Sequence, residues 1–483
     1  MAIVNRNQSR QIEGGTEDRL DLSFLVPVEW LPWARVAVIL GVLGMAAGLG
    51  FLIAKRNPAY GLLAAAMPLV VLGVMFMLLH LKYAPVVVMS VAAFVPLSLP
   101  TGTGSRLVLS LAFTSLFAGL WVFRMWLVDK RFHLTPSSIN LPLLGFVVAV
   151  LVSLAWSNVF MDPLVFLSRS FPFVQGASAL VMVMLPAAFL MAANLVDSLK
   201  MIKAMVAMLL VAGVIGLVKQ YEVFDFPFNT GGLYTTWIIA LSAGLAMFGN
   251  RMGFVWRGLF LALAGVWVFW GAILHVSWVS GWLPGLVAIV VLISLRSKKL
   301  AVLAAVVMAV VVYVNQTYYA GVVNQEDTES GNTRLAAWQQ NWRVTSQHLL
   351  FGTGPAGYAA YYMSYFPKEA MATHSNYVDI LAQTGVVGFA FYTAIFGLIA
   401  WKGYRLCRRL KGRGDFTEAL ANSLLAGTVA GIVAMALGDW LIPFAYTQTI
   451  AGFDHSVFSW LLMALIPVLD RLTPPGAEAA LHA

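Results

Sequence analysis

Charge is scarce in this chain of 483 residues, because only 11% of the side chains are Asp, Glu, Lys or Arg. Soluble globular domains carry about 25% charged residues, so the composition excludes an ordinary soluble domain. Hydrophobic residues make up 60% of the sequence, and the mean hydropathy is +0.83. The chain is therefore predicted to be an integral membrane protein.

Cysteine is nearly absent as well. The single thiol, Cys407, has no partner for an internal disulfide, and no zinc-ligand spacing surrounds it. The chain also lacks a glycine-rich phosphate-binding loop and a dinucleotide fingerprint, so we expect no metal and no cofactor.

A net charge of +9 would suggest nucleic acid in a soluble protein. Here we attribute the excess to Lys and Arg in cytoplasmic loops and expect no nucleic-acid partner.

Long apolar runs fill most of the chain. A membrane-spanning helix needs roughly 20 apolar residues, and by this measure we expect an all-α polytopic protein with about 12–14 transmembrane helices. The predicted spans begin near Leu31, Tyr60, Ala84, Leu107, Ile139, Phe173, Met201, Leu233, Trp256, Val276, Leu300, Val378, Glu418 and Gly452. The predicted domains are a cytoplasmic tail (1–30), a helix bundle (31–314), a large extracytoplasmic loop (315–377), C-terminal spans (378–472) and a second cytoplasmic tail (473–483).

Basic residues gather at alternate turns between these spans. The strongest cluster is Lys402, Arg405, Arg408, Arg409, Lys411 and Arg413. Because cytoplasmic loops are enriched in Lys and Arg, we expect these turns to face the cytoplasm. The large loop would then lie outside, in the periplasm if the cell is Gram-negative. The protein itself is expected in the inner (cytoplasmic) membrane of a bacterial cell. The last outer turn, near Ile442–Gly452, is flanked by Asp439 and followed by Asp454 and His455.

The polar segment 315–377 interrupts the apolar background. Polar and aromatic residues at helical spacing predict a helix over Thr333–Leu349, and the glycines that follow end it. Tyr358–Phe366 could form a second short helix. Hydrogen-bonding groups persist at the edge of the hydrocarbon region only where water or protein satisfies them. This loop is therefore the place where we expect the chemistry.

Two residues of the loop are candidate catalytic groups. Arg334 carries a guanidinium that can hold phosphate oxygens with two parallel hydrogen bonds. It could equally be a surface arginine, solvated or paired with Glu326, Asp327 or Glu329. His374 carries an imidazole that can take a proton from a hydroxyl at neutral pH. It could equally be an interfacial residue before a helix that Ser375 or Asn376 caps.

Further residues are predicted to contact the substrate, and they include two cations and several aromatic side chains. They are Arg169, Arg343, Trp338, Tyr358, Tyr377 and Asn376. Arg169 could instead be an anchor at the membrane interface. The tyrosines between 358 and 365 could stack on sugar rings or simply belong to the aromatic belt at the lipid headgroups.

The order of these residues carries more information than any one of them. Arg334 precedes Trp338, the turn Gly352-Thr353-Gly354-Pro355 follows, and nine residues separate His374-Ser375 from Gly385-Val386-Val387-Gly388. This order resembles the O-antigen ligase and polymerase superfamily of bacterial envelope glycosyltransferases. The specific match covers residues 331–388, and elsewhere the agreement is in topology.

The resemblance implies a reaction at the outer face of the membrane. An acceptor hydroxyl would attack the anomeric carbon of a glycan linked to undecaprenyl diphosphate, and the lipid diphosphate would leave. His374 would be the general base or the group that positions the acceptor, and Arg334 would hold the diphosphate and stabilise its developing charge. The acceptor would be a lipid A–core sugar in a ligase or a second lipid-linked repeat in a polymerase. Membrane lipid and a polysaccharide export complex are further expected partners.

One part of the family pattern is missing. Many members carry Ser-Arg-Gly at the head of a helix before the large loop, and its arginine is a second phosphate ligand. This chain has Ser277-Trp278-Val279-Ser280-Gly281 at that place. Either Arg169 or Arg343 supplies the charge, or diphosphate binding differs. His275, close by, could contribute only when protonated.

A flippase or polysaccharide transporter is the alternative from another functional class. It would carry charges deep within several spans and paired broken helices in two related halves. Few charges fall within the spans here, and Pro284-Gly285 has no partner break in the other half. We therefore prefer the glycosyltransferase, and a scaffold within an export complex is a third interpretation.

Overall fold

The computed structural model describes residues 80–100, 105–223, 233–276, 278–303, 332–367 and 371–474, together with positions 44, 73, 231, 306 and 313. Several predictions fall outside these residues. They are the N-terminal tail, the spans near Leu31 and Tyr60, most of the span near Leu300, the start of the large loop and most of the C-terminal tail.

The chain divides into two compact units. The first comprises Met1–Tyr83 and Leu120–Phe132, and the second Ala84–Gly119 and His133–Ala483. The described part of the first unit is mainly the end of α4 (Leu109–Phe123) and a π-helical turn, Arg124–Val128. All residues of the candidate site belong to the second unit.

Helices make up almost all of the regular structure in the described residues. Besides α4, the α-helices are α3 (Ala84–Phe94), α5 (Asn140–Val159), α6 (Phe171–Leu195), α7 (Leu199–Gln220), α8 (Tyr234–Phe248), α9 (Phe254–Phe269), α10 (Val279–Arg296), α13 (Asn332–Thr345), α14 (Gly357–Tyr365), α15 (Asn376–Leu410), α16 (Phe416–Ala434) and α17 (Phe453–Leu472). Two three-residue strands, β1 (Ser98–Pro100) and β2 (Arg106–Val108), pair antiparallel.

The helices confirm an all-α polytopic membrane protein. Among the described residues, nine helices are long and apolar enough to cross a membrane, and two shorter apolar helices cover 81–94 and 234–248. These eleven begin within a few residues of eleven predicted starts. The remaining three predicted spans, near Leu31, Tyr60 and Leu300, are those that lie wholly or largely outside the described residues.

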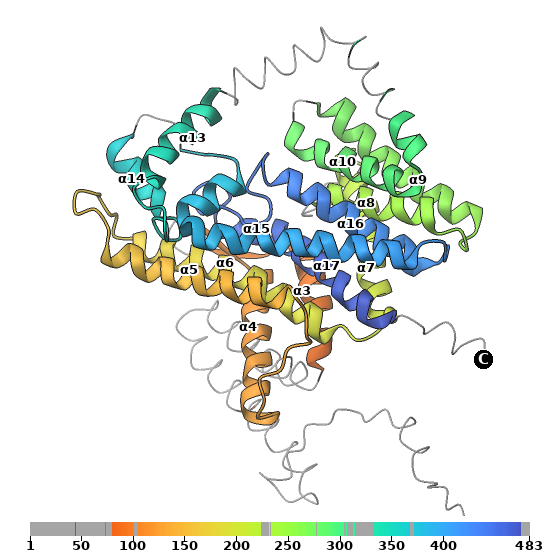
Figure 1. Cartoon of the computed structure of the whole chain (residues 1–483), viewed down its shortest axis with the longest axis horizontal. Coiled ribbons are helices and arrows are strands. Elements are labelled where there is room, and N and C mark those ends of the chain that lie inside the picture. Colours follow the sequence, from red (N-terminus) through yellow and green to blue (C-terminus); the bar gives the residue numbers. More distant parts are fainter. Residues whose placement is uncertain are drawn as a thin grey trace, which may run out of the picture. The chain divides into compact units, whose positions relative to one another are not determined.

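The core of the second unit is formed by α16 and α17, whose residues are mostly buried. The α16 helix packs against α8, α10 and α15, and α17 packs against α6 (Figure 1). Small residues along α16 allow its neighbours to approach closely, as is common between helices in membranes. A hydrogen bond of 2.9 Å from the Trp237 Nε1–H of α8 to the Ser459 hydroxyl ties the same core together.

The described part of the large loop forms a two-helix cap on α15. Here α13 and α14 pack against each other and against α15 (Figure 1). Their bounds, Asn332–Thr345 and Gly357–Tyr365, lie close to the predicted 333–349 and 358–366. The sequence pattern therefore identified both helices, and only the end of the first was placed one turn too late.

Gly385 interrupts α15 and makes the docking of this cap possible. Its φ of 64° and ψ of −170° break the helix, so nearby carbonyl groups are free to accept bonds from another segment. The N–H groups of Thr353 and Gly354 donate to the carbonyls of Ala382 (2.9 Å) and Gln383 (3.0 Å). The glycine-rich turn thus binds the broken helix directly.

Both glycine motifs are needed because the two backbones nearly touch. A Cβ at Gly352 would lie 2.5 Å from the carbonyl carbon of Gln383, and one at Gly385 would lie 2.4 Å from that of Leu350. Both glycines also have positive φ, which L side chains rarely adopt. These motif positions therefore place the cap, and with it α13, over the head of α15.

Candidate functional site

A cavity of about 470 Å³ lies where several helices of the second unit begin. Trp278 and Ser280 belong to the start of α10, His374 precedes α15, and Gly452 and His455 stand at the head of α17. The N-terminus of a helix carries a partial positive charge and unpaired N–H groups. This end of the bundle therefore favours an anionic ligand.

Arg334 forms part of the wall from the first turn of α13. The side chain is half-buried, and its buried Nε has no hydrogen-bond partner among the residues that the structure describes. The three acids considered as its partners, Glu326, Asp327 and Glu329, lie outside those residues. A buried guanidinium N–H without a partner is costly in a folded protein unless a ligand or water satisfies it.

His374 lies in the same wall, immediately before α15. Its backbone is left-handed, with φ of 47°, and 43% of its side chain is exposed. The imidazole Nδ1 lies 3.9 Å from Oδ1 of Asp439, which is 2% exposed. That distance is within ion-pair range but too long for a hydrogen bond in this geometry. The buried carboxylate thus faces one nitrogen of a solvent-accessible imidazole.

Asp439 is itself fixed by the loop between α16 and α17, residues 435–449. Its Oδ2 accepts a hydrogen bond from the Thr447 hydroxyl and one of 3.3 Å from the Phe444 N–H. The side chain of Asn376 ties this loop to the head of α15, because it accepts from the Leu441 N–H (2.9 Å) and donates to the Ile442 carbonyl (2.6 Å). Asn376 therefore holds the carboxylate near His374.

Trp338 links α13 to the segment that carries His374. Its indole N–H donates to the carbonyl of Thr373, the residue before His374, at 2.7 Å. The hydroxyl of Tyr362 donates to the carbonyl of Ala337 at 2.6 Å, which fixes α13 on α14. Arg334 lies one turn before Trp338 on α13. The bond from Trp338 to Thr373 therefore also fixes the position of Arg334 relative to His374.

The cavity is also lined by a group of aromatic and amide side chains, which we call the neutral wall. Trp278 and Trp440 pack edge to face with ring centroids 6.2 Å apart. Three buried atoms on this side, Trp440 Nε1, Gln448 Oε1 and His455 Nδ1, have no hydrogen-bond partner within the described part of the chain. Donors and acceptors beside aromatic faces are the features by which proteins bind uncharged polar ligands.

The two other predicted cations lie elsewhere. Arg169 is exposed in the connection between α5 and α6. Arg343 is exposed on α13 and donates to the Gln340 side chain at 3.1 Å. Neither is among the residues that line the cavity, and neither is His275. Their contact with substrate stays a prediction.

The predicted tyrosines are held in protein contacts. Tyr358 is fully buried, stacks on Phe444 at 4.6 Å and donates to Asp379 at 2.8 Å. Burial, together with that carboxylate, holds the pKa of Tyr358 well above its ordinary value. Tyr377 donates to the Ile432 carbonyl at 2.9 Å. Neither ring lines the cavity, so a sugar-stacking role for them also stays a prediction.

The cap is anchored on its outer side by a polar cluster. The Tyr365 hydroxyl donates to Asp162 at 2.6 Å, and the Ser364 hydroxyl accepts from the Phe166 N–H at 2.8 Å. His348 packs edge to face on Tyr361, with ring centroids 5.1 Å apart. Burial lowers the pKa of His348, and the nearby Asp162 carboxylate acts in the opposite direction. We therefore expect the contact between cap and bundle to depend on the protonation of His348.

Sequence analysis did not assign a role to Asp439, Trp440 or Gln448. Asp439 was noticeable only as an acid beside an outer turn, and nothing in the spacing linked it to His374, 65 positions earlier. Among the described residues, no group of three or more His, Cys, Asp or Glu could hold a metal ion.

Residues 228–393 match the family described as O-antigen ligase. The matched region runs from the residues before α8 into α15, so it contains Arg334 and His374 but not Asp439. None of the curated proteins matches the chain in sequence. The family match confirms the resemblance found in the motif order.

Proposed function

We propose that this chain, a member of the O-antigen ligase and polymerase superfamily, is a membrane glycosyltransferase that moves a lipid-linked glycan onto an acceptor hydroxyl. The match over residues 228–393 supports the general class, an enzyme of ligase or polymerase type. The donor, its undecaprenyl diphosphate carrier and the acceptor are our proposal. The observation that carries it is the shared cavity of Arg334 and His374, with Asp439 beside the imidazole.

In the proposed reaction His374 acts as general base. Its Nδ1 faces Asp439, which favours the tautomer with the proton on Nδ1 and leaves Nε2 to accept the proton of the acceptor hydroxyl. The acceptor oxygen forms a bond to the anomeric carbon while the bond from that carbon to the phosphate oxygen breaks. The electron pair leaves with the lipid diphosphate, and Asp439 stabilises the imidazolium that forms.

Arg334 would stabilise the leaving group. The departing diphosphate gains negative charge, and a fixed cationic donor in a water-poor site is worth most against charge that develops in the transition state. The second arginine of the family pattern is absent from α10, where Trp278 and Ser280 stand. We propose that the convergent helix N-termini and the Ser280 hydroxyl partly replace it, since they favour negative charge without an additional cation.

The neutral wall would bind the sugar that is transferred. A sugar ring offers both an apolar C–H face and several hydroxyl groups. Trp278 and Trp440 supply aromatic surfaces, and Gln448 and His455 supply buried atoms that lack partners among the described residues. Arg334 and the neutral wall would therefore separate phosphate recognition from sugar recognition within one cavity.

The expected orientation follows from the distribution of charge along the helices. The basic cluster from Lys402 to Arg413 lies at the end of α15 remote from His374. Since basic residues are enriched on the cytoplasmic side, we propose an inner-membrane protein whose cavity opens to the periplasm. The undecaprenyl chain would lie along apolar helix surfaces in the bilayer.

The direct test is transfer in a reconstituted system. Purified protein in lipid nanodiscs would be given a lipid-diphosphate-linked glycan with either lipid A–core or a second lipid-linked glycan. We expect transfer to one acceptor, its loss in His374→Ala, and no effect of a chelator. Failure of the wild-type protein with both acceptors, when a known family member is active in the same assay, would reject the function.

The choice between ligase and polymerase is best made in cells that lack the protein. Unmodified lipid A–core together with long lipid-linked chains on a gel would indicate a ligase. Lipid A–core capped with single repeats would indicate a polymerase.

A further inference from the structure

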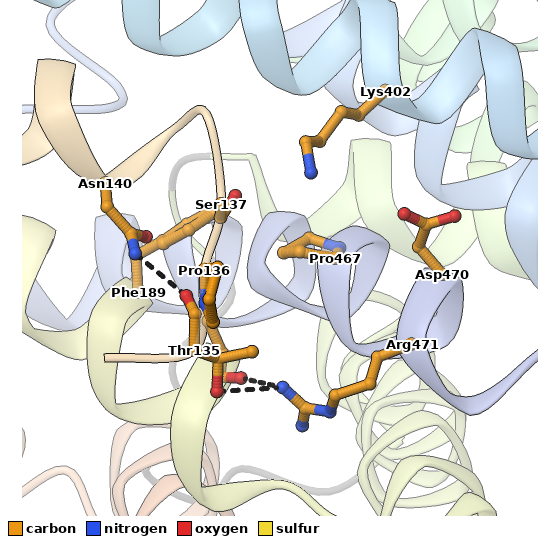
Figure 2. Close-up of a pocket in the computed structure, with 10 residues that line it drawn as sticks. Thr135, Pro136, Ser137, Asn140, Phe189, Lys402, Pro467, Asp470 and Arg471 are labelled. Carbon is orange, nitrogen blue, oxygen red and sulfur yellow. Dashed lines mark hydrogen bonds between the residues drawn. The ribbon is translucent and has the colours of Figure 1, made fainter. Parts of the chain in front are cut away.

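A second cavity, of about 230 Å³, is lined in part by residues near the C-terminal ends of α15 and α17, the two helices whose N-terminal ends lie at the first cavity. Figure 2 shows the residues that line the second cavity. Its polar wall consists of Thr135, Ser137, Asn140, Lys402, Asp470 and Arg471. Along α17, Asp470 stands sixteen positions after Asp454, which adjoins His455 of the first cavity, and this corresponds to about 24 Å of helix. The second cavity is therefore distinct from the proposed catalytic site.

Arg471 is held rigidly in this wall. Its guanidinium donates to the carbonyls of Ala193 (2.9 Å) and Val196 (2.8 Å) at the end of α6, and to the Thr135 hydroxyl (3.3 Å). All three partners are neutral, so the positive charge remains. Asp197 is close enough to act on that charge but is exposed to solvent, where its field is screened.

Lys402 extends from α15 into the opening of the cavity, and Figure 2 shows its amine pointing into the space between Ser137 and Asp470. The side chain is half-buried, and its ammonium group has no hydrogen bond or ion pair with any described residue. The nearest candidate, Asp470, is already paired with Arg409 at 2.6 Å. A half-buried ammonium group in a cavity, beside a carboxylate that another cation neutralises, is an unused anion ligand.

We propose that this cavity binds the phosphate group of an anionic phospholipid. The Lys402 ammonium group would contact the phosphate directly, and the charge of Arg471 would favour an anion in the cavity without contact. The Ser137 hydroxyl would donate a hydrogen bond to the phosphate, since its oxygen already accepts one from the Ile139 N–H at 3.3 Å. The start of α5 at Asn140 adds the partial charge of a helix N-terminus to the same wall. A phosphate at the end of a membrane helix bundle is most readily supplied by lipid, and basic pockets of this kind are suited to anionic headgroups.

The test compares lipid retention in two single-charge variants. Lys402→Gln removes the unpaired ammonium group, whereas Lys411→Gln removes an exposed one at the end of the same helix. Full-length protein in detergent would be exposed to phosphatidylglycerol, to phosphatidylethanolamine with the same acyl chains, or to inorganic phosphate, and bound adducts counted by native mass spectrometry. We expect preferential retention of phosphatidylglycerol, reduced about fivefold by Lys402→Gln and unchanged by Lys411→Gln.

A thermal melt supplies the second measurement. Phosphatidylglycerol should raise the melting temperature of the wild type and of Lys411→Gln more than that of Lys402→Gln, because ligand that binds the folded state stabilises it. Equal retention and equal stabilisation in the three proteins would overturn the proposal. If the protein retains inorganic phosphate but no phosphatidylglycerol, the cavity binds free phosphate and the proposal of a phospholipid ligand is wrong.

Discussion

His374 Nδ1 lies 3.9 Å from Oδ1 of Asp439, while Oδ2 of the same carboxylate is held by Thr447 and by the Phe444 N–H. The carboxylate is buried and cannot swing toward solvent, whereas the imidazole is partly exposed to the cavity. A small movement of His374 would convert the contact into a hydrogen bond. In the proposed mechanism this contact would shorten when substrate binds, because hydrogen bonds between catalytic groups often tighten in the substrate complex.

The first prediction concerns this pair. Asp439→Asn keeps the acceptor for Thr447 and Phe444 but replaces the charge that faces the imidazole. We expect kcat to fall by roughly 10²-fold or more with a small change in the KM for donor, because a positioned general base contributes about 10²–10⁴ in rate and Asp439 orients that base. The measurement is steady-state transfer in nanodiscs. If Asp439 acts through His374, the double variant with His374→Ala should be no slower than His374→Ala alone.

The sequence could predict much of this architecture for physical reasons. Apolar runs long enough to cross a bilayer locate spans directly, and helical spacing in a polar segment located α13 and α14. Arg334 and His374 could be selected as candidates because the order of the motifs that contain them is local. Their convergence on one cavity depends on the hydrogen bonds of Trp338 and Asn376, which no spacing rule contains.

Asp439 and Gln448 illustrate the part that was not predictable. Both lie in an irregular loop whose path is set by bonds to the head of α15, and loops lack the periodicity that makes helices recognisable. Asn376 and Tyr358 are predicted substrate contacts, and the structure shows their side chains in buried hydrogen bonds within the protein. Contact of either residue with substrate stays a prediction.

Arg334 and Arg343 form a matched pair for the second prediction. They lie on the same helix, but only Arg334 lines the cavity. We expect Arg334→Ala to lower kcat by about 10²–10³-fold, as removal of one transition-state donor does elsewhere, and Arg334→Lys to recover part of the loss. Arg343→Ala should retain most activity. Equal loss in both alanine variants would mean that the helix, and not the cavity cation, had been disturbed.

Gly385 and Gly397 both lie in α15, and together they test whether the break at Gly385 is needed for the cap to dock. An alanine at Gly385 would meet the Leu350 backbone and require a positive φ, whereas at Gly397 nothing lies within 4 Å of the added Cβ. We expect Gly385→Ala to destabilise the protein by about 2–3 kcal/mol. Gly397→Ala should be neutral or stabilising by up to about 1 kcal/mol. Denaturation of both variants in the same detergent gives the comparison, and equal midpoints would refute the proposed docking role.

The cap should loosen as the pH falls, because of His348. Burial lowers its pKa below the ordinary value of 6.5, so protonation favours the open state over the packed one. The stabilisation is complete above pH 6.5 and declines as the pH falls through that value toward the lower folded pKa. Asp162, whose pKa is also lowered by its hydrogen bond from Tyr365, titrates in a more acidic window.

Hydrogen exchange of residues 332–367 between pH 8 and pH 5.5, corrected for intrinsic rates, measures this effect. We expect protection to fall in the wild type. The matched variant is His348→Phe, which keeps a ring against Tyr361 but cannot titrate. An equal fall in that variant would assign the pH dependence to another group.

Gln448 allows the sugar-binding part of the proposal to be tested apart from the chemistry. Its side-chain oxygen is buried in the cavity wall and has no hydrogen-bond partner among the described residues, so its removal breaks no described hydrogen bond. Gln448→Leu keeps the volume and removes the acceptor. Since one neutral hydrogen bond contributes about 0.5–1.5 kcal/mol, we expect the KM for donor to rise by up to about tenfold with kcat little changed.

Two comparisons make that result specific. Gln339→Leu carries the same substitution at an exposed position of α13 and should leave the KM unchanged. A set of donors that each lack one sugar hydroxyl should contain one for which wild type and Gln448→Leu have the same KM, because the bond is then missing in both. If every deoxygenated donor still distinguishes the two proteins, Gln448 acts on the shape of the cavity and not on a sugar hydroxyl.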